Sequence, residues 1–378
     1  MSFNLIRNSR VFFTTNVDTE TGVVAASGFT TSNTREIQVL DGLSFSQNTT
    51  SETVTLNEGG TTPVRGQRSY NTALEPVDFS FSTYMRPADG GTNITAEEGC
   101  LWNALLGKDA IGGSNPAWVE GLTYATASTA PSSQNHQLEK FGLLIVIDGV
   151  SYIIDNCALD SASIDFGLDA IAMVAWAGKG GAIRQVSITA DTANPVVLGG
   201  DISGNALVKN ATAPYIANKL STVALEGGIN GGGTTYTVAL TGGSLTISNN
   251  ITYLTPANLG IVNQPFTYFT GTRAISGSIN AYLRTGANNT AGLLSDMLDG
   301  STYEVDPAYS IQIDIGGSTS ATRVALIMPA TVLTIPTVST EQVVSTTINF
   351  TAQANTAGEF DVGAANELEV RYYTTNAA

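Results

Sequence analysis

Apolar and polar residues alternate along much of the chain, most clearly in "FSFSTYMR" at residues 79–86 and in "GSINAYLR" at residues 277–284. In both segments every second side chain is apolar or small, and those between are mostly polar. This period of two predicts antiparallel strands with one face packed inward and one face in water. Aligned on their tyrosines, the segments share a polar face formed by Ser80, Ser82, Tyr84 and Arg86 in the first and by Ser278, Asn280, Tyr282 and Arg284 in the second.

The similarity between two parts of the chain extends beyond these strands. In the same order, "NLIRNSRVFFTT" matches "YIANKLSTVALE", "LSFSQN" matches "LTISNN", "TAEEGCLWNALLG" matches "TAGLLSDMLDG", "LIVIDG" matches "IQIDIG" and "ASIDF" matches "TTINF". Six ordered matches, counting the opening strand, predict an internal duplication. We expect a first module in residues 1–190 and a second in residues 200–378, joined by the Gly- and Pro-containing stretch 192–210.

One helix is predicted in each half. In the first, Thr95 is the expected N-cap, Glu98 completes a capping box and Gly107 ends the helix; Thr290 and Gly300 bound the second. The apolar stripes that should pack against a sheet are Leu101, Trp102 and Leu105, and Leu293, Leu294, Met297 and Leu298. The predicted fold is therefore mainly β, with two tandem two-sheet β-sandwich or partial-barrel modules, each with one flanking α-helix.

Two long segments are predicted to be loops that contact a partner. Residues 56–76 are Gly-rich and carry Arg65 and Arg68 in a chain poor in basic residues. Residues 252–271, at the matching place, are more apolar and aromatic. Loops of this length are usually functional or disordered, and exposed aromatic patches favour burial against another chain. A mobile surface loop is the alternative. The candidate contact residues are Arg65, Arg68, Tyr70, Phe266, Tyr268 and Phe269.

The charge excludes a simple nucleic-acid-binding module. The chain of 378 residues has 16 basic and 32 acidic residues, a formal charge of −16, without the basic footprint that neutralises phosphates. The excess is spread over both halves, with 10 basic against 19 acidic residues in 1–190 and 6 against 13 in 191–378. This leaves a surface that touches DNA without holding it, or charge that serves solubility.

Candidate catalytic chemistry is sparse. The single histidine, His136, lies in a polar stretch without partners at metal-site or triad spacing. Glu97 and Glu98 form a carboxylate pair, but acidic groups in the first turn of a helix simply complement its dipole. We predict no enzyme activity, no cofactor and no metal site. No apolar run approaches the roughly 20 residues of a membrane span, and "MSFNLIRNSR" does not read as a secretory signal, so we expect a cytoplasmic origin.

Taken together, these features resemble the major tail (tail tube) proteins of long-tailed bacteriophages. The resemblance rests on the strand "NLIRNSRVFFTTN", the strand–loop–strand unit from Thr53 to Arg86, the helix from Thr95 to Gly107 and the closing strands through Trp176. The second half repeats all four, so the resemblance covers most of the chain.

The resemblance implies hexameric rings whose inner sheets join into a continuous barrel, stacked through loops and termini around a lumen that DNA crosses. Two modules per chain imply trimers with pseudo-sixfold symmetry, and about four inner strands per module give about 24 per ring. The two matched strands would be equivalent inner strands, the long loops would make inter-subunit or inter-ring contacts, and an acidic lumen would repel phosphate. Implied partners are further copies of the chain, tail proteins such as a tape measure, sheath or terminator protein, and DNA in transit. The implied location is the virion, with assembly in the host cytoplasm.

Two other functions fit parts of the sequence. An extracellular adhesin or sheath-like structural β protein would share the acidity and the Thr/Gly richness. A polysaccharide-degrading enzyme would use Glu97 and Glu98.

Overall fold

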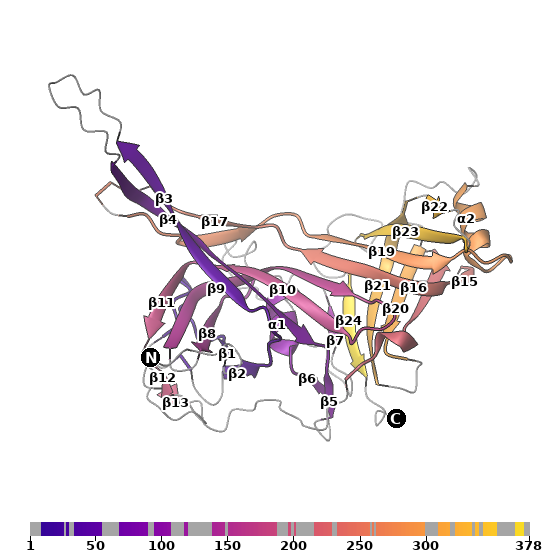
Figure 1. The fold of residues 1–378 in the computed structure, drawn as a ribbon, viewed down its shortest axis with the longest axis horizontal. Helices are drawn as coiled ribbons and strands as arrows, with labels where there is room; N and C mark the ends of the chain where they lie inside the picture. Colours follow the sequence, from indigo (N-terminus) through magenta and orange to yellow (C-terminus); the bar gives the residue numbers. More distant parts are fainter. Residues whose placement is uncertain are drawn as a thin grey trace, which may run out of the picture.

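The computed structural model describes residues 9–25, 28–29, 34–54, 68–89, 94–106, 117–119, 138–147, 150–186, 196–197, 200–201, 215–228, 233–257, 259–260, 262–298, 309–317, 322–334, 337–339, 343–353 and 367–373. Within these ranges the chain is mainly β, with two α-helices and one antiparallel 18-stranded sheet system (Figure 1). The predicted fold class is confirmed at this level.

In the first half, two rows of strands share one long strand. The first row is ordered β2 (Thr34–Ile37), β1 (Ser9–Thr14), β8 (Phe141–Ile147), β9 (Val150–Asp165) and β11 (Ala182–Val186). The second row is ordered β3 (Ser44–Val54), β4 (Arg68–Tyr84), β10 (Met173–Gly180) and again β9. Strand β9 serves both rows because its first part pairs with β8 and β11, and its second part pairs with β10.

The second half is also built from two rows. The first is ordered β15 (Thr235–Thr237), β14 (Thr222–Gly227), β20 (Tyr309–Ile315), β21 (Arg323–Leu333) and β24 (Glu369–Tyr373), and β7 (Ala117–Val119) adds to β24. The second is ordered β16 (Ala239–Ser248), β19 (Ala274–Tyr282), β23 (Ser345–Ala352) and the end of β21, which β22 (Thr337–Ser339) continues beside β23.

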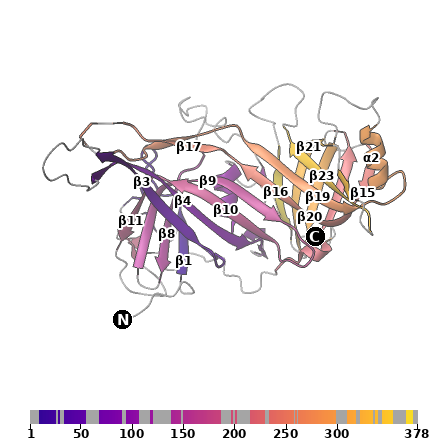
Figure 2. The same ribbon diagram turned by 45° about the horizontal axis from the view of Figure 1, so that its top comes forward.

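The two halves are joined by hydrogen-bonded strands. The end of β9, Ser161–Asp165, pairs antiparallel with Ser244–Ser248 of β16. The second rows of both halves therefore form one continuous sheet, ordered β3–β4–β10–β9–β16–β19–β23–β22, along the long axis of the molecule (Figures 1 and 2). Three short ladders complete the described strands: β5 (Pro87–Asp89) with β6 (Ile94–Ala96), β12 (Val196–Val197) with β13 (Gly200–Asp201), and β17 (Ile251–Leu254) with β18 (Thr267–Thr270).

The predicted alternation of β4 and β19 is confirmed. Phe79, Phe81, Ile275 and Ile279 are buried in the main core, while Ser80 and its alternating neighbours remain at least partly exposed. The apolar face of the continuous sheet therefore packs inward and the polar face is open to water.

In each half, a phenylalanine on one strand packs opposite a glycine on the neighbouring strand. Phe79 of β4 lies opposite Gly178 of β10, and Gly277 of β19 lies opposite Phe350 of β23. A Cβ atom at Gly178 would lie 2.4 Å from Cζ of Phe79, and one at Gly277 would lie 2.5 Å from Cζ of Phe350. Each ring thus occupies the space over the opposite glycine, which conserves the packed volume.

The helices differ from their predicted boundaries. Helix α1 spans Gly99–Leu106 and begins four residues after Thr95, because Ile94–Ala96 forms β6 instead of a cap. Glu98 precedes the helix, and its carbonyl accepts the N–H groups of Leu101 and Trp102. Helix α2 spans Thr290–Leu298.

The predicted apolar stripes are mostly confirmed. Leu101, Trp102 and Leu105 are fully buried. Leu293 is 1% exposed and Met297 is 6% exposed. Leu294 is partly exposed, and Leu298, which was predicted to pack inward, is 57% exposed. Gly107 and Gly300, the predicted ends of the two helices, lie outside the described residues.

Candidate assembly surfaces

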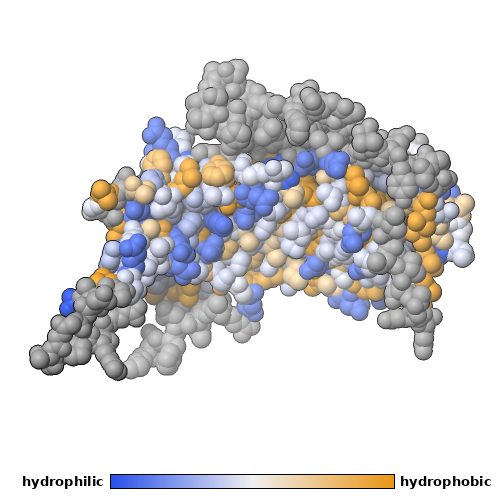
Figure 3. Space-filling model, turned by 90° about the horizontal axis from the view of Figure 1, so that it is seen from above, coloured by the Kyte–Doolittle hydropathy of each residue, from blue (hydrophilic) through white to orange (hydrophobic). Residues whose placement is uncertain are grey.

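The polar face of the continuous sheet is lined by small hydroxyl and amide side chains. We call it the hydroxyl face, and it comprises Ser44, Ser46, Ser80, Ser82, Tyr84, Met173, Ala175, Ala177, Ser161, Ser163, Ser244, Thr246, Ser248, Ala274, Ser276, Ser278, Asn280, Tyr282, Ser345, Thr347, Asn349 and Thr351, with Asp78, Asp165 and Lys179 as its described charged groups. Oγ of Ser44 lies 2.8 Å from Oγ of Ser80, and Oγ of Ser244 lies 3.1 Å from Oγ of Ser278. The described part of this face therefore carries few carboxylates. Viewed from above, the molecule shows pale and blue residues mixed with orange ones (Figure 3).

The two arginines predicted for this face lie beyond the ends of their strands. Arg86 is 6% exposed; its Nη1 lies 3.2 Å from Oε1 of Glu97, and its guanidinium lies 4.5 Å from the centre of the Tyr215 ring. Arg284 is exposed near the start of α2, where its backbone N–H donates to Oγ1 of Thr290. The polar positions that the two strands share therefore end at Tyr84 and Tyr282.

The hairpin β17–β18, from the second half, packs on the first half. Oη of Tyr268 donates to the carbonyl of Leu138 at 2.6 Å, and the Tyr268 ring is buried in a cluster that includes Ala158. Oη of Tyr253 donates to the carbonyls of Asn156, at 2.5 Å, and Lys179, at 3.0 Å. Burial raises the pKa of Tyr253 well above its ordinary value. This hairpin is an anchored contact between the two halves of one chain.

The predicted loop at residues 252–271 is thus partly strand, and its aromatic residues have different environments. Tyr268 is 1% exposed and contacts its own chain, whereas Phe266 is 53% and Phe269 is 41% exposed. The Phe266 carbonyl accepts a hydrogen bond from Nδ2 of Asn156. Of the three candidate aromatic residues in this segment, Phe266 and Phe269 are exposed and accessible to another chain.

The hairpin β3–β4 projects from the molecule at the opposite end from α2 (Figure 1). Residues 68–76, predicted as loop, are part of β4, because they pair with β3 over most of their length. Tyr70 is 54% exposed, and its hydroxyl donates to Oε2 of Glu52 at 2.8 Å, which raises the pKa of Tyr70. Arg68 is exposed at the end of the described hairpin, and Arg65 lies outside the described residues.

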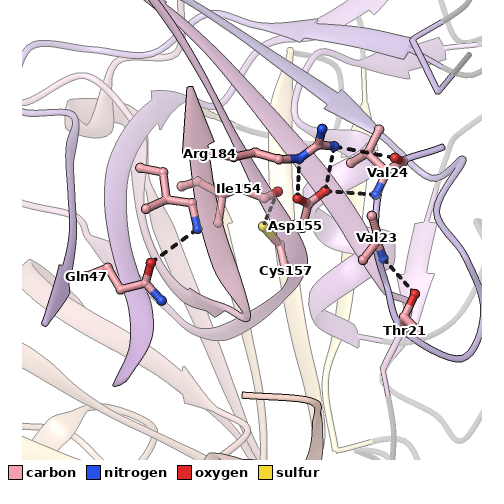
Figure 4. Close-up of polar contacts among 9 residues, drawn as sticks. Thr21, Val23, Val24, Gln47, Ile154, Asp155, Cys157 and Arg184 are labelled. Atoms are coloured by element: carbon pink, nitrogen blue, oxygen red, sulfur yellow. Dashed lines mark hydrogen bonds and ion pairs between the residues drawn. The ribbon is translucent and has the colours of Figure 1, made fainter. Parts of the chain in front are cut away.

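Two hydrogen-bond networks that the sequence did not predict connect the strands and the helix behind these surfaces. In the first, Asp155 of β9 accepts Nε of Arg184 at 2.6 Å and the N–H of Val24 at 2.8 Å (Figure 4). Nearby, Oε1 of Gln47 accepts the N–H of Ile183, which ties β3 to β11. An acidic residue in the apolar run "SYIIDNC" was the available signal for Asp155.

The second network joins α1 to the last strand. The Tyr372 hydroxyl donates to Glu98 and accepts Nε1 of Trp102 at 2.9 Å. Burial raises the pKa of Glu98 to about 8, so this carboxyl is largely neutral at pH 7. Nothing in "EVRYY" indicated that Tyr372 would reach a helix of the other half.

Both carboxylates considered for hydrolysis thus have structural partners, Arg86 for Glu97 and Tyr372 for Glu98. Among the described residues, no group of three or more His, Cys, Asp and Glu side chains could hold a metal ion. Cys100 and Cys157 are free, and burial raises the pKa of Cys100 to about 12. His136 lies outside the described residues. The helices described here, of 8 and 9 residues, are too short to cross a membrane.

Comparison with known proteins gives two matches. The family described as "Phage tail tube protein" matches residues 60–352. The tail tube protein pb6 of Escherichia phage T5 is 30% identical over 362 residues, which cover 93% of this chain and 73% of pb6.

Proposed function

The chain belongs to the phage tail tube protein family, and we propose that three copies close into a ring and that such rings stack to form the conduit for DNA in a phage tail. As a family member it is a structural component of the virion. This membership replaces the adhesin and the polysaccharide-degrading enzyme considered from the sequence.

The order of strand pairing supports two modules per chain, in residues 1–190 and 200–378. The row β2–β1–β8–β9–β11 has the counterpart β15–β14–β20–β21–β24, and β3–β4–β10–β9 has the counterpart β16–β19–β23–β21. Helix α1 follows β4 after the short ladder β5–β6, and α2 follows β19 directly. Each module is then two sheets sharing one long strand, with one flanking helix.

The registers support the same equivalence. Ser44 lies opposite Ser80, and Ser244 lies opposite Ser278. On the other side of each strand, Tyr84 lies opposite Met173 and Tyr282 lies opposite Ser345, the first residues of β10 and β23. The predicted inner strands therefore correspond residue by residue, from Ser80 and Ser278 to Tyr84 and Tyr282.

The pairing of β9 with β16 within the chain is the observation that best supports ring formation. The same sheet has β3 at one edge and β22 at the other. The described ladder of β3 is with β4 alone. Strand β22 pairs with β23 at the position where the end of β9 pairs with β10. Repeating the junction between chains places β3 of one copy against β22 of the next. By the register of β9 with β16, Ser46 would then lie opposite Thr337.

Ring closure has a physical advantage. An open sheet presents unpaired backbone groups at both edges, which promote uncontrolled pairing, and closure removes these edges. With eight strands in the row of each chain, three chains give a barrel of about 24 strands, wider than barrels of 16–18 strands that already hold aqueous channels.

In this arrangement the hydroxyl face lines the lumen. Of the 32 acidic residues of the chain, only Asp78 and Asp165 belong to the described part of this face, beside one cation, Lys179. Duplex DNA binds proteins chiefly through cations that neutralise phosphates. We propose that DNA slides because the lumen offers few cations, with repulsion by carboxylates a minor contribution. Other tail proteins, such as a tape measure, sheath or terminator protein, are further proposed partners of the tube.

Negative-stain electron microscopy of the purified full chain tests this function. We expect rings or hollow tubes that form at high protein concentration. A chain that stays monomeric by light scattering across the accessible concentration range would contradict the proposal.

A further inference from the structure

The hairpin of the second module is anchored on its neighbour. The hairpin of the first module bonds its own chain through the backbone of Thr72 and Leu74, which pair with Asn263, and leaves Tyr70 exposed. We propose that the outer part of the β3–β4 hairpin, residues 49–54 and 68–74, docks on the second module of the next chain in the same ring, over β21 and β23. This inference rests on the ring proposed above and adds a second contact to each junction between chains.

The two hairpins occupy equivalent places in their modules. Each extends from the pair of inner strands that carries the hydrogen-bonded serines, Ser44 with Ser80 and Ser244 with Ser278. Tyr70 precedes Ser80 by the same number of residues as Tyr268 precedes Ser278. Tyr268 is 1% exposed and Tyr70 is 54% exposed, so only one of the two equivalent rings is covered within the chain.

The surface that covers Tyr268 has an uncovered counterpart in the second module. Ala158 of β9, in the cluster around Tyr268, lies opposite Lys179, whose carbonyl accepts Oη of Tyr253. At the corresponding positions, Val332 of β21 lies opposite Thr351 of β23. Ala158 is fully buried, whereas Val332 is 38% exposed and Thr351 is exposed. Val332 is thus exposed to solvent, whereas the equivalent residue Ala158 is covered by hairpin β17–β18.

The geometry of the internal junction identifies the occupant of this place. Hairpin β17–β18 begins directly after β16 and packs on the module whose β9 pairs with β16. Repeating this relation at the β22–β3 junction puts the β3–β4 hairpin over the module that supplies β22. A tyrosine suits the contact, because its ring buries a large area and its hydroxyl finds a polar partner, as that of Tyr268 does at Leu138. The occupant is therefore a second copy of this chain, beside the first in the ring.

Oxidative cross-linking of assembled full-length chains tests the contact. The double variant Tyr70→Cys with Val332→Cys is expected to give covalent species that end at three chains, because head-to-tail links close within one ring. Each single variant controls for Cys100 and Cys157. The pair Tyr70→Cys with Leu298→Cys, which places the second thiol at an exposed site on α2, controls for random collision.

The outcomes separate this inference from the proposed function. Normal tubes without cross-links above the controls would overturn the hairpin contact and leave the ring standing. A ladder that continues beyond three chains would also overturn it, because the hairpin would then reach a stacked ring. Absence of rings or tubes from the wild-type chain would overturn the proposed function itself.

A second measurement avoids introduced thiols. Tyr70→Ala is expected to raise the critical concentration for tube formation about tenfold, the factor that corresponds to about 1.4 kcal/mol. Leu298→Ala is expected to leave it unchanged. Equal effects of the two substitutions would contradict the docking of Tyr70.

Discussion

Glu98 is a carboxyl group buried between the first helix and the last strand. Its Oε1 accepts the Tyr372 hydroxyl, and its Oε2 is buried without a hydrogen-bond partner within the described structure. Burial is the main cause that raises its pKa from 4.5 to about 8. The folded chain therefore retains a proton here that the unfolded chain has lost over this interval, so the contribution of Glu98 to stability declines as the pH rises from about 4.5 to about 8.

Replacement of Glu98 by glutamine tests this coupling. The amide is neutral at every pH, so the stability difference, variant minus wild type, should grow as the pH rises from 5 to 8, with a slope of up to about 1.4 kcal/mol per pH unit. Urea unfolding of the unassembled chain at several pH values measures it. A difference independent of pH would contradict a neutral Glu98 in the folded chain.

The exchange of phenylalanine and glycine between the halves gives a second residue-scale prediction. Phe79→Ala should cost about 3–5 kcal/mol, because it leaves a cavity over Gly178. Gly178→Ala should also destabilise, since its Cβ would lie 2.4 Å from the Phe79 ring and 2.6 Å from the Ala158 carbonyl. The double variant should be more stable than the sum of the two losses predicts, because one clash disappears. Additive unfolding free energies would contradict the packing of Phe79 over Gly178.

At the scale of elements, the sequence predicts faces better than registers. A strand shifted by two residues keeps the same side chains inward, so alternation alone cannot detect the shift. Matching Leu43 with Leu245 shows the difficulty. Under the proposed duplication, the pairing of Ser44 with Ser80 and of Ser244 with Ser278 differs from that match by two residues.

Some elements could not be predicted because their partners lie far away in the chain. "ASIDF" and "TTINF" have similar patterns, yet Ile164 lies in β9 and Ile348 lies in β23, which corresponds to β10 under the proposed duplication. The Thr95 cap is missing for a local reason, because β6 pairs with the preceding strand β5. Tyr268 was predicted to contact another chain, but in the described structure it contacts the other half of its own chain.

The β3–β22 junction gives a prediction at this scale. Ser46→Cys with Thr337→Cys should form disulfides between chains in assembled protein, because directly opposed residues have Cβ atoms about 4.5–5.5 Å apart. Thr246→Cys with Ser163→Cys is the matched control, since these residues are opposed within one chain and should form an internal disulfide. Non-reducing electrophoresis distinguishes the two. An internal disulfide in the control without linked chains in the test pair would contradict the junction.

At the scale of the whole molecule, the net charge of the chain does not give the charge of the hydroxyl face. The charge of −16 belongs to the chain as a whole, while the described hydroxyl face carries two carboxylates and one ammonium group. Composition alone could not separate them, because it does not say which residues share a face. In the proposed ring, hydroxyl groups that offer phosphates no fixed counter-charge would favour the passage of DNA.

Cations introduced on this face should turn the conduit into a DNA-binding surface. Tubes of the double variant Ser82→Lys with Asn280→Lys should retain short duplex DNA on sedimentation, and the retention should fall steeply as salt rises. Ser82→Asn with Asn280→Ser is the neutral control. Retention by wild-type tubes equal to that of the lysine variant would contradict a lumen formed by the hydroxyl face.

Electron cryo-microscopy of the assembled tube tests the proposed ring closure. We expect three chains per ring, a closed barrel of about 24 strands and β3 of each chain paired with β22 of the next, with Ser46 opposite Thr337. A ring with another number of chains, or one in which β3 and β22 do not meet, would contradict it.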